Sequence, residues 1–211
     1  MTFENVFLAM AMVLGISVGT AIVRRHGAHR IPLLTLVVAM LTVAGFTLQV
    51  LQPGTLEALQ RNSSAIAAGQ WWRLLTTLFV QDGGWAGFLS NLAGLVLVGA
   101  PAEQLVSRRV WTGLYFVPAF VVELIALYWQ PVGGGNSIAW MALAGAVWIL
   151  ALRRKGGLTI SLLSGAGLVI GVLLSAVGNI HGPAILLGAM LGWAVAVMHP
   201  DAISTDEVRR E

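Results

Sequence analysis

Seven long apolar stretches restrict this 211-residue chain to very few folds. Lipid offers the backbone no hydrogen-bond partner, so a segment of about 20 apolar residues that crosses the hydrocarbon core must be helical. Hydrophobic residues make up 57% of the sequence and charged residues 10%, against about a quarter in soluble proteins. We therefore expect an all-α membrane protein. The expected spans are Phe3–Val23, Ile31–Leu51, Trp85–Ala100, Trp111–Trp129, Asn136–Leu152, Leu158–Ser175 and Ile180–Met198.

The lysines and arginines predict how these spans are oriented. Ten of the twelve fall in alternate connections or near the end of the chain, all on one side of a seven-span topology. The positive-inside rule makes that side cytoplasmic and places the N-terminus outside, in what we expect to be a prokaryotic plasma membrane. Because topology accounts for the basic charge, no nucleic acid is expected as a partner. The ten residues are Arg24, Arg25, Arg30, Arg108, Arg109, Arg153, Arg154, Lys155, Arg209 and Arg210.

The chain has no cysteine, which excludes disulfides, thiolate metal sites and a cysteine nucleophile. No cofactor and no metal is expected, and the oligomeric state is left open. The first apolar stretch lacks a preceding basic region and runs into Arg24 and Arg25 rather than a cleavage site, which predicts an uncleaved helix and not a signal peptide.

The one long non-cytoplasmic connection is residues 52–84, which we call the first loop. Its second half, residues 71–80, is amphipathic and aromatic, so it suits the membrane interface, where indole rings settle and an arginine such as Arg73 can snorkel to the surface. From these residues alone, a plain interfacial anchor is the main interpretation.

A glycine-rich turn, Gly133–Gly135, delivers Ser137 to the start of an apolar, small-residue span. Backbone N–H groups and the positive end of the helix dipole favour negative charge there, as the oxyanion formed by a serine nucleophile requires. The alternative is that the serine only caps or packs a membrane helix. Glycines recur in the later spans, and the GxxxG spacing of Gly188 and Gly192 predicts a closely packed bundle.

Four polar residues from different spans are expected in the outer half of the bilayer: Asn91, Glu123, Ser137 and His181. Polar groups in lipid are costly, so each needs a partner or a purpose. Taken singly, Asn91 can join two helices by a hydrogen bond, His181 can bind a backbone carbonyl, and Glu123 can lie near headgroups or pair with Arg73. Taken together, Ser137 and His181 can form a nucleophile and its base. No acidic residue is obviously placed to orient the imidazole, so we expect a dyad.

From Ile31 to about His199 the sequence resembles the rhomboid family of intramembrane serine proteases. That family has a Trp-Arg pair in its first loop, an Asn followed three turns later by a Glu, a Gly-x-Ser-Gly nucleophile motif, and His-x-x-Gly-x-x-x-Gly at the last core helix. The matching positions are Trp72 and Arg73, Asn91 and Glu103, Gly135, Ser137 and the later Gly145, and His181, Ala184 and Gly188, with alanine replacing one glycine.

The resemblance implies a six-helix rhomboid-like core at residues 31–199. Residues 1–30 would add an N-terminal transmembrane helix with its basic loop, and residues 200–211 a cytoplasmic tail. It also implies that Ser137 attacks, that His181 transfers the proton, and that Asn91 with the backbone N–H of Ser137 binds the oxyanion. Trp72 and Arg73 would hold the first loop in the interface, Gly135, Gly145, Ala184 and Gly188 would serve helix packing, and the substrates would be transmembrane helices of other proteins.

The sequence departs from the family pattern at four places. Gly87 stands where a histidine usually helps bind the oxyanion, Ile138 replaces the glycine after the nucleophile, the connection before His181 is short, and Pro183 lies in the first turn of the last span. These changes keep open a rhomboid-like pseudoprotease that binds transmembrane clients without cutting them. A small-solute transporter is the third hypothesis, although the chain shows no inverted repeat and no charged path through the midplane.

Overall fold

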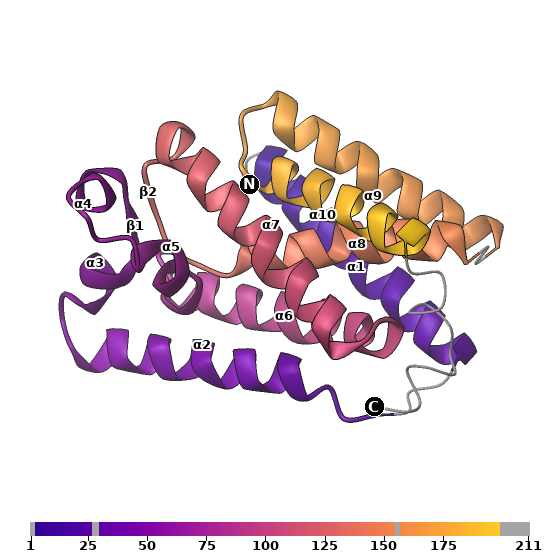
Figure 1. The fold of residues 1–211 in the computed structure, drawn as a ribbon, viewed down its shortest axis with the longest axis horizontal. Coiled ribbons are helices and arrows are strands. Elements are labelled where there is room, and N and C mark those ends of the chain that lie inside the picture. Colours follow the sequence, from indigo (N-terminus) through magenta and orange to yellow (C-terminus); the bar gives the residue numbers. More distant parts are fainter. Residues whose placement is uncertain (1–2, 27–29, 155–156, 199–211) are drawn as a thin grey trace.

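The computed structural model describes residues 3–26, 30–154 and 157–198 and shows an all-α bundle (Figure 1). The expected tail at 200–211 lies outside the described residues. The long helices are α1 (Phe3–His26), α2 (Leu33–Leu51), α6 (Gly84–Leu105), α7 (Arg108–Trp129), α8 (Ser137–Arg153), α9 (Leu158–Ala176) and α10 (His181–Met198). Each overlaps one of the seven expected spans.

Five of these helices, α2, α6, α7, α9 and α10, are long and apolar enough to cross a membrane. The other two expected spans correspond to shorter apolar helical segments, Asn5–Ala21 within α1 and Ser137–Arg153. The chain is therefore an integral, multi-pass, all-α membrane protein. The expected fold class is confirmed.

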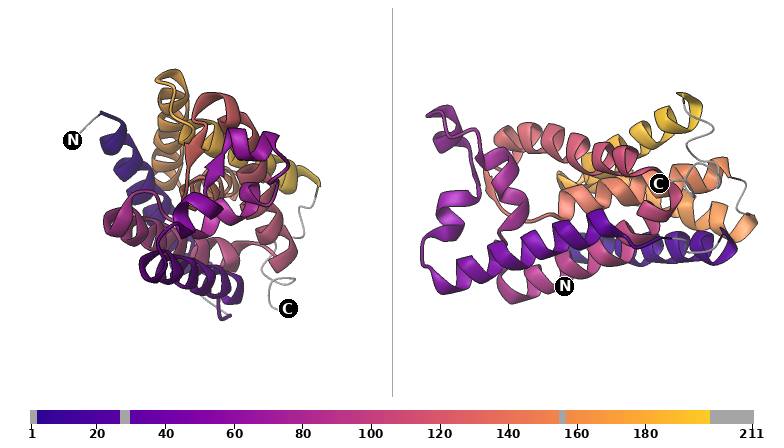
Figure 2. Two further views of the ribbon diagram at one scale, coloured as in Figure 1. Left: turned by 90° about the vertical axis from the view of Figure 1, so that its left-hand side faces the viewer. Right: turned by 60° about the horizontal axis from the view of Figure 1, so that its bottom comes forward.

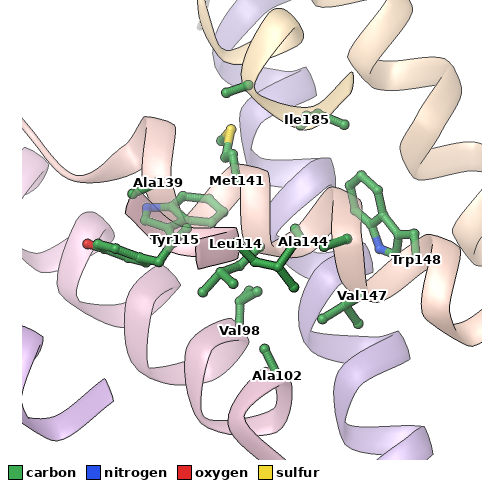
Figure 3. Packing of buried hydrophobic residues seen from close by; sticks show 14 of the residues in the cluster. Val98, Ala102, Leu114, Tyr115, Ala139, Met141, Ala144, Val147, Trp148 and Ile185 are labelled. Atoms are coloured by element: carbon green, nitrogen blue, oxygen red, sulfur yellow. The ribbon is translucent and has the colours of Figure 1, made fainter. Parts of the chain in front are cut away.

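Helix α8 occupies the centre of the bundle. It packs against α10, α7, α6, α1 and α9, and nearly all of its side chains are buried. A helix that is apolar on every side has no face for solvent, so it is placed inside the protein. Figure 3 shows Met141, Ala144, Val147 and Trp148 of α8 together with Val98 and Ala102 of α6, Leu114 and Tyr115 of α7, and Ile185 of α10.

Small residues bring α8 and α10 into close contact. A Cβ atom at Gly188 would collide with the carbonyl oxygen of Ala142, and one at Gly145 would collide with the carbonyl oxygen of Ile185. Ala184, which is in α10 like Gly188, is fully buried. In lipid, helices associate through van der Waals packing, so such backbone contacts hold the pair together.

Replacing Gly188 with alanine is expected to lower the free energy of unfolding by about 1–3 kcal/mol, because the new methyl group has no space. Gly165→Ala is the matched control, since nothing lies within 4 Å of a Cβ atom at Gly165. The control should leave stability unchanged or raise it slightly. Reversible unfolding in mixed micelles measures both, and equal stabilities of the two variants would contradict the prediction.

The first loop folds into short elements at one end of the bundle (Figures 1 and 2). Strand β1 pairs antiparallel with β2, which precedes α8, so that Arg61 lies opposite Gly133. The pairing ties the first loop to the glycine-rich turn that leads into α8. The elements of the first loop are α3 (Thr55–Leu59), β1 (Arg61–Asn62), α4 (Ser63–Ala67), α5 (Arg73–Thr76) and the 3₁₀ helix η1 (Thr77–Phe79). Strand β2 (Val132–Gly133) lies outside the loop, between α7 and α8.

Arg73 does not snorkel to the surface as expected. It is buried, and its guanidinium donates to the backbone carbonyls of Glu57 (2.6 Å) and Gln60 (3.0 Å) and to the side chain of Gln70 (2.7 Å). Carbonyls near the end of a short helix lack backbone partners, and a guanidinium can satisfy several of them at once. Arg73 thus joins parts of the first loop, whereas the neighbouring Trp72 is 54% exposed.

Glu103 fixes the opposite end of the bundle. Its fully buried carboxylate accepts hydrogen bonds from the backbone N–H of Leu34 (3.0 Å) and from the N–H and hydroxyl of Thr35 (2.9 and 3.0 Å). These are N–H groups of the first turn of α2, which a helix cannot satisfy by itself. A carboxylate on α6 therefore caps α2 and joins the two helices.

Candidate active site

Ser137 and His181 are each the first residue of a helix, and the two helices begin at the same end of the bundle. The Nε2 atom of His181 lies 2.8 Å from the Oγ atom of Ser137. The close packing of α8 on α10 places the two helix starts side by side. The pair expected from sequence is therefore in hydrogen-bond contact.

The turn before Ser137 is held by the first loop. Gly135 has a φ of +144°, which only glycine adopts easily, and its N–H donates to the carbonyl of Thr77 at 2.9 Å. The N–H of Gly134 donates to the side chain of Asp82 at 3.0 Å, and the hydroxyl of Thr77 donates to the carbonyl of Gly133 at 2.9 Å. These contacts fix the path of the chain into α8.

Asn179 contacts the second ring nitrogen of His181. Its Oδ1 atom lies 2.6 Å from Nδ1 of His181 and accepts the backbone N–H of the same residue at 3.0 Å. A backbone N–H can only donate, so the atom facing His181 must be the amide oxygen. The ring nitrogen Nδ1 must then carry the proton, which leaves Nε2 free to accept the hydroxyl proton of Ser137.

Asn179 was not predicted from the sequence. From the sequence we expect only a short connection before His181, and the expected partners of its imidazole are Ser137 or a backbone carbonyl. An asparagine often accepts the backbone N–H two residues later, and this spacing precedes the helix that begins at His181. That local signal could have identified it.

Asn91 lies against the glycine-rich turn that precedes Ser137. Its Nδ2 atom donates to Oε1 of Gln81 at 2.7 Å, and its Oδ1 atom accepts the indole N–H of Trp140 at 3.4 Å. The indole can only donate, so it fixes which side of the amide carries the oxygen. A Cβ atom on Gly135 would lie 2.8 Å from Nδ2, so only a glycine leaves room for this amide.

Gln81 is a second residue of the site that was not predicted from the sequence. It is fully buried, and its backbone N–H and carbonyl are paired with the side chain of Gln49 (2.9 and 2.8 Å). Its side chain contacts Asn91 and lies beside Gly135, where a Cβ atom would be 3.3 Å from Oε1. No sequence pattern indicates either neighbour.

Asn91, Glu123, Ser137 and His181, the four polar residues expected to converge, all line one cavity of about 110 Å³. The cavity is polar enough to hold water, which a hydrolytic reaction would require. Its remaining walls come from the first loop, the glycine-rich turn and the residues next to the pair. They are Arg61, Asp82, Gln130, Val132, Gly133, Gly134, Gly135, Ile138 and Ile180.

Glu123 neither faces headgroups nor pairs with Arg73, the two alternatives expected for it. It is 1% exposed and forms an ion pair with Arg61, whose Nε atom also donates to the carbonyl of Gln130 at 2.9 Å. A Cβ atom at Gly133 would lie 2.7 Å from the guanidinium, so the glycine opposite Arg61 in the β1–β2 pair leaves room for it. The β1–β2 pairing therefore brings Arg61, and not the expected Arg73, to Glu123.

These features define an all-α, multi-pass membrane protein in which two helix starts bring a serine and a histidine together beside a small polar cavity. A model of the Rhomboid domain matches residues 68–200, and the chain belongs to the rhomboid family. That family includes intramembrane serine proteases. No curated protein matches the chain.

Proposed function

We propose that this protein is an intramembrane serine protease that cleaves a transmembrane helix of another membrane protein. The observation that supports it best is the 2.8 Å contact between Ser137 Oγ and His181 Nε2 at the start of two packed helices. A serine hydroxyl is a weak nucleophile, and a base within hydrogen-bond distance activates it.

In the proposed reaction, Ser137 Oγ bonds to the carbonyl carbon of the scissile peptide while its proton moves to Nε2 of His181. The tetrahedral intermediate collapses when the C–N bond breaks, and His181 returns the proton to the leaving amine. Water then attacks the acyl-enzyme, gives a proton to His181 and releases the new carboxyl group as Ser137 recovers its proton. Asn179 would hold the imidazole in the required tautomer.

The oxyanion would be stabilised by the backbone N–H of Ser137 and by Asn91. Ser137 begins α8, so its N–H has no partner within the helix and lies at the positive end of the dipole. Asn91 uses one N–H for Gln81, and its second is available for a substrate oxygen. The missing histidine at Gly87 would cost one donor, and losing one typically slows catalysis by about 10²–10³-fold.

The substrate class follows from the location of the pair at the end of a membrane-embedded bundle. A peptide bond within a stable helix is shielded by its hydrogen-bonded turn, so the substrate must unwind locally to reach Ser137. Helix-destabilising residues near the cleavage site are therefore expected. By the positive-inside rule, cleavage would take place towards the outer face of the membrane.

Labelling with a fluorophosphonate probe tests this function, because the probe reacts only with an activated serine. The purified protein in detergent should be labelled, and both Ser137→Ala and His181→Ala should lose labelling. Circular dichroism and thermal unfolding would show that the variants remain folded. An unlabelled wild-type protein, or labelling that survives in Ser137→Ala, would contradict the proposed chemistry.

A pseudoprotease that binds transmembrane clients is the second candidate, and Gly87 is the observation that favours it. Nothing lies within 4 Å of a Cβ atom at this position, so no described side chain fills the space directly beside Gly87, where the family pattern has a histidine. This candidate predicts no labelling of the wild-type protein but retained photocrosslinking to a transmembrane peptide.

A further inference from the structure

A second cavity, of about 320 Å³, opens from Ser137 and His181 towards α1. One of its walls is the first half of α1, and the others belong to α6, α8 and α10. Helix α1 therefore shields the Ser–His pair from the lipid on this side. The lining residues are Asn5, Leu8, Ala9 and Met12 of α1 with Ser90, Asn91, Ser137, Trp140, Met141 and His181.

Helix α1 packs along a surface formed by three other helices, and we call this surface the groove. It packs against α9, α6 and α8, and the left view of Figure 2 shows it running between α9 and α6. The groove thus already holds one apolar helix of 24 residues. Because one of its ends reaches the Ser–His pair, an apolar helix in this groove is next to the proposed nucleophile.

The contacts that hold α1 differ along its length. Ala11 and Val18 are fully buried. Gly15 and Gly19 lie directly against neighbouring side chains. A Cβ atom at Gly15 would be 3.3 Å from Cβ of Ala144, and a Cβ atom at Gly19 would be 2.9 Å from Cβ of Pro101. Small residues thus recur at every fourth position from Ala11 to Gly19. Towards Asn5, in contrast, the helix borders the cavity.

The chain after α1 is attached to α6. The Nε atom of Arg30 donates to the carbonyl of Glu103 at 2.9 Å, and its guanidinium also reaches the carbonyl of Val106. An α1 helix that left the groove would therefore remain tethered at the end remote from Ser137.

We propose that α1 occupies the groove in which a transmembrane client helix docks, so that α1 and the client exchange. The proposal rests on the proposed function in that the client is the helix that meets Ser137. A client must bring a peptide bond to about 3 Å from Ser137, and α1 blocks the approach along this groove. In lipid no hydrophobic driving force favours either helix, so an incoming helix with similar packing can replace α1 at little net cost.

A disulfide that fastens α1 in the groove tests the exchange. The chain contains no cysteine, and Cβ atoms at Gly15 and Ala144 are 3.3 Å apart, close to the roughly 3.5–4.5 Å found in disulfides. The oxidised and reduced forms of the double variant Gly15→Cys/Ala144→Cys can be compared with each other. Both forms carry the same substitutions, so a folding defect caused by them does not affect the comparison. The single cysteine variants are the controls for the redox treatment.

The probe is a synthetic peptide of residues 3–26 with benzoylphenylalanine in place of Ala9, reconstituted with the protein in vesicles. Because α1 fits the groove, its own sequence is a suitable incoming helix. We expect the reduced double variant to crosslink the peptide and the oxidised form to crosslink at least tenfold less. Equal crosslinking in both forms, or none in either, would overturn the proposal.

Loosening α1 should have the opposite effect. Gly19→Leu introduces a side chain against Pro101 and should raise peptide crosslinking several-fold, whereas Val13→Leu, at a 57% exposed position, should not. Fluorophosphonate labelling of Ser137 in the oxidised and reduced forms is recorded separately. Absent labelling would contradict the proposed protease chemistry, whereas the crosslinking result alone decides whether α1 exchanges with a client helix.

Discussion

Asn179→Ala is expected to slow fluorophosphonate labelling of Ser137 by about 10²-fold, near the lower end of what a positioned general base contributes. Without the amide oxygen, which lies 2.6 Å from Nδ1 of His181, the proton is no longer held on that nitrogen and the ring is free to turn. In a larger fraction of the molecules, His181 then carries its proton on Nε2. This nitrogen can no longer accept the hydroxyl proton of Ser137. The second-order labelling rate constant is the measurement.

Asn179→Asp should restore most of that rate, because a carboxylate accepts from both the backbone and the ring N–H of His181. It should also shift the pH profile of labelling to higher pH, since a negative charge beside the ring favours imidazolium. A structural role alone does not predict the shift of the pH profile. Ser107→Ala, which removes a side chain that accepts a backbone N–H at the start of α7, controls for lost stability. An Asn179→Ala rate within twofold of wild type would show that Asn179 has no part in orienting the base.

The helices could be predicted from sequence because lipid leaves an apolar segment few alternatives. The second expected span, Ile31–Leu51, and helix α2, Leu33–Leu51, end at the same residue. The third was expected to end at Ala100, yet α6 continues to Leu105. The apolar pattern alone stops before Glu103, which is nevertheless buried because α2 supplies the hydrogen bonds that its carboxylate needs.

The convergence of Asn91, Glu123, Ser137 and His181 could be predicted because membrane topology fixes the depth of each residue. The partners of these residues could not. Arg61 and Glu123 are 62 positions apart, and only the pairing of two-residue strands brings the arginine to the carboxylate. Strands this short leave no periodicity in the sequence, so Arg73 was an equally reasonable partner.

Glu123→Ala should lower the free energy of unfolding by about 3–5 kcal/mol, which is the usual cost of leaving one charge of a buried pair uncompensated. The side chains of Glu123 and Arg61 are only 1% and 3% exposed, so water in the cavity beside them replaces little of the interaction that the arginine loses. Because Arg61 also binds the carbonyl of Gln130 beside β2, its movement should disturb the turn before Ser137 and slow probe labelling as well. Unfolding in mixed micelles gives the free energy.

The double variant Arg61→Met/Glu123→Leu decides whether the pair is needed for stability or for the shape of the site. Replacing both charges with apolar groups of similar size removes the uncompensated charge and should recover most of the lost stability. Labelling of Ser137 should nevertheless stay below wild type, because methionine cannot bind the carbonyl of Gln130. Glu57→Ala, at an exposed carboxylate of the same loop, should change stability by no more than about 0.5 kcal/mol. A Glu123→Ala variant as stable as this control would mean that Arg61 finds another partner when the carboxylate is absent.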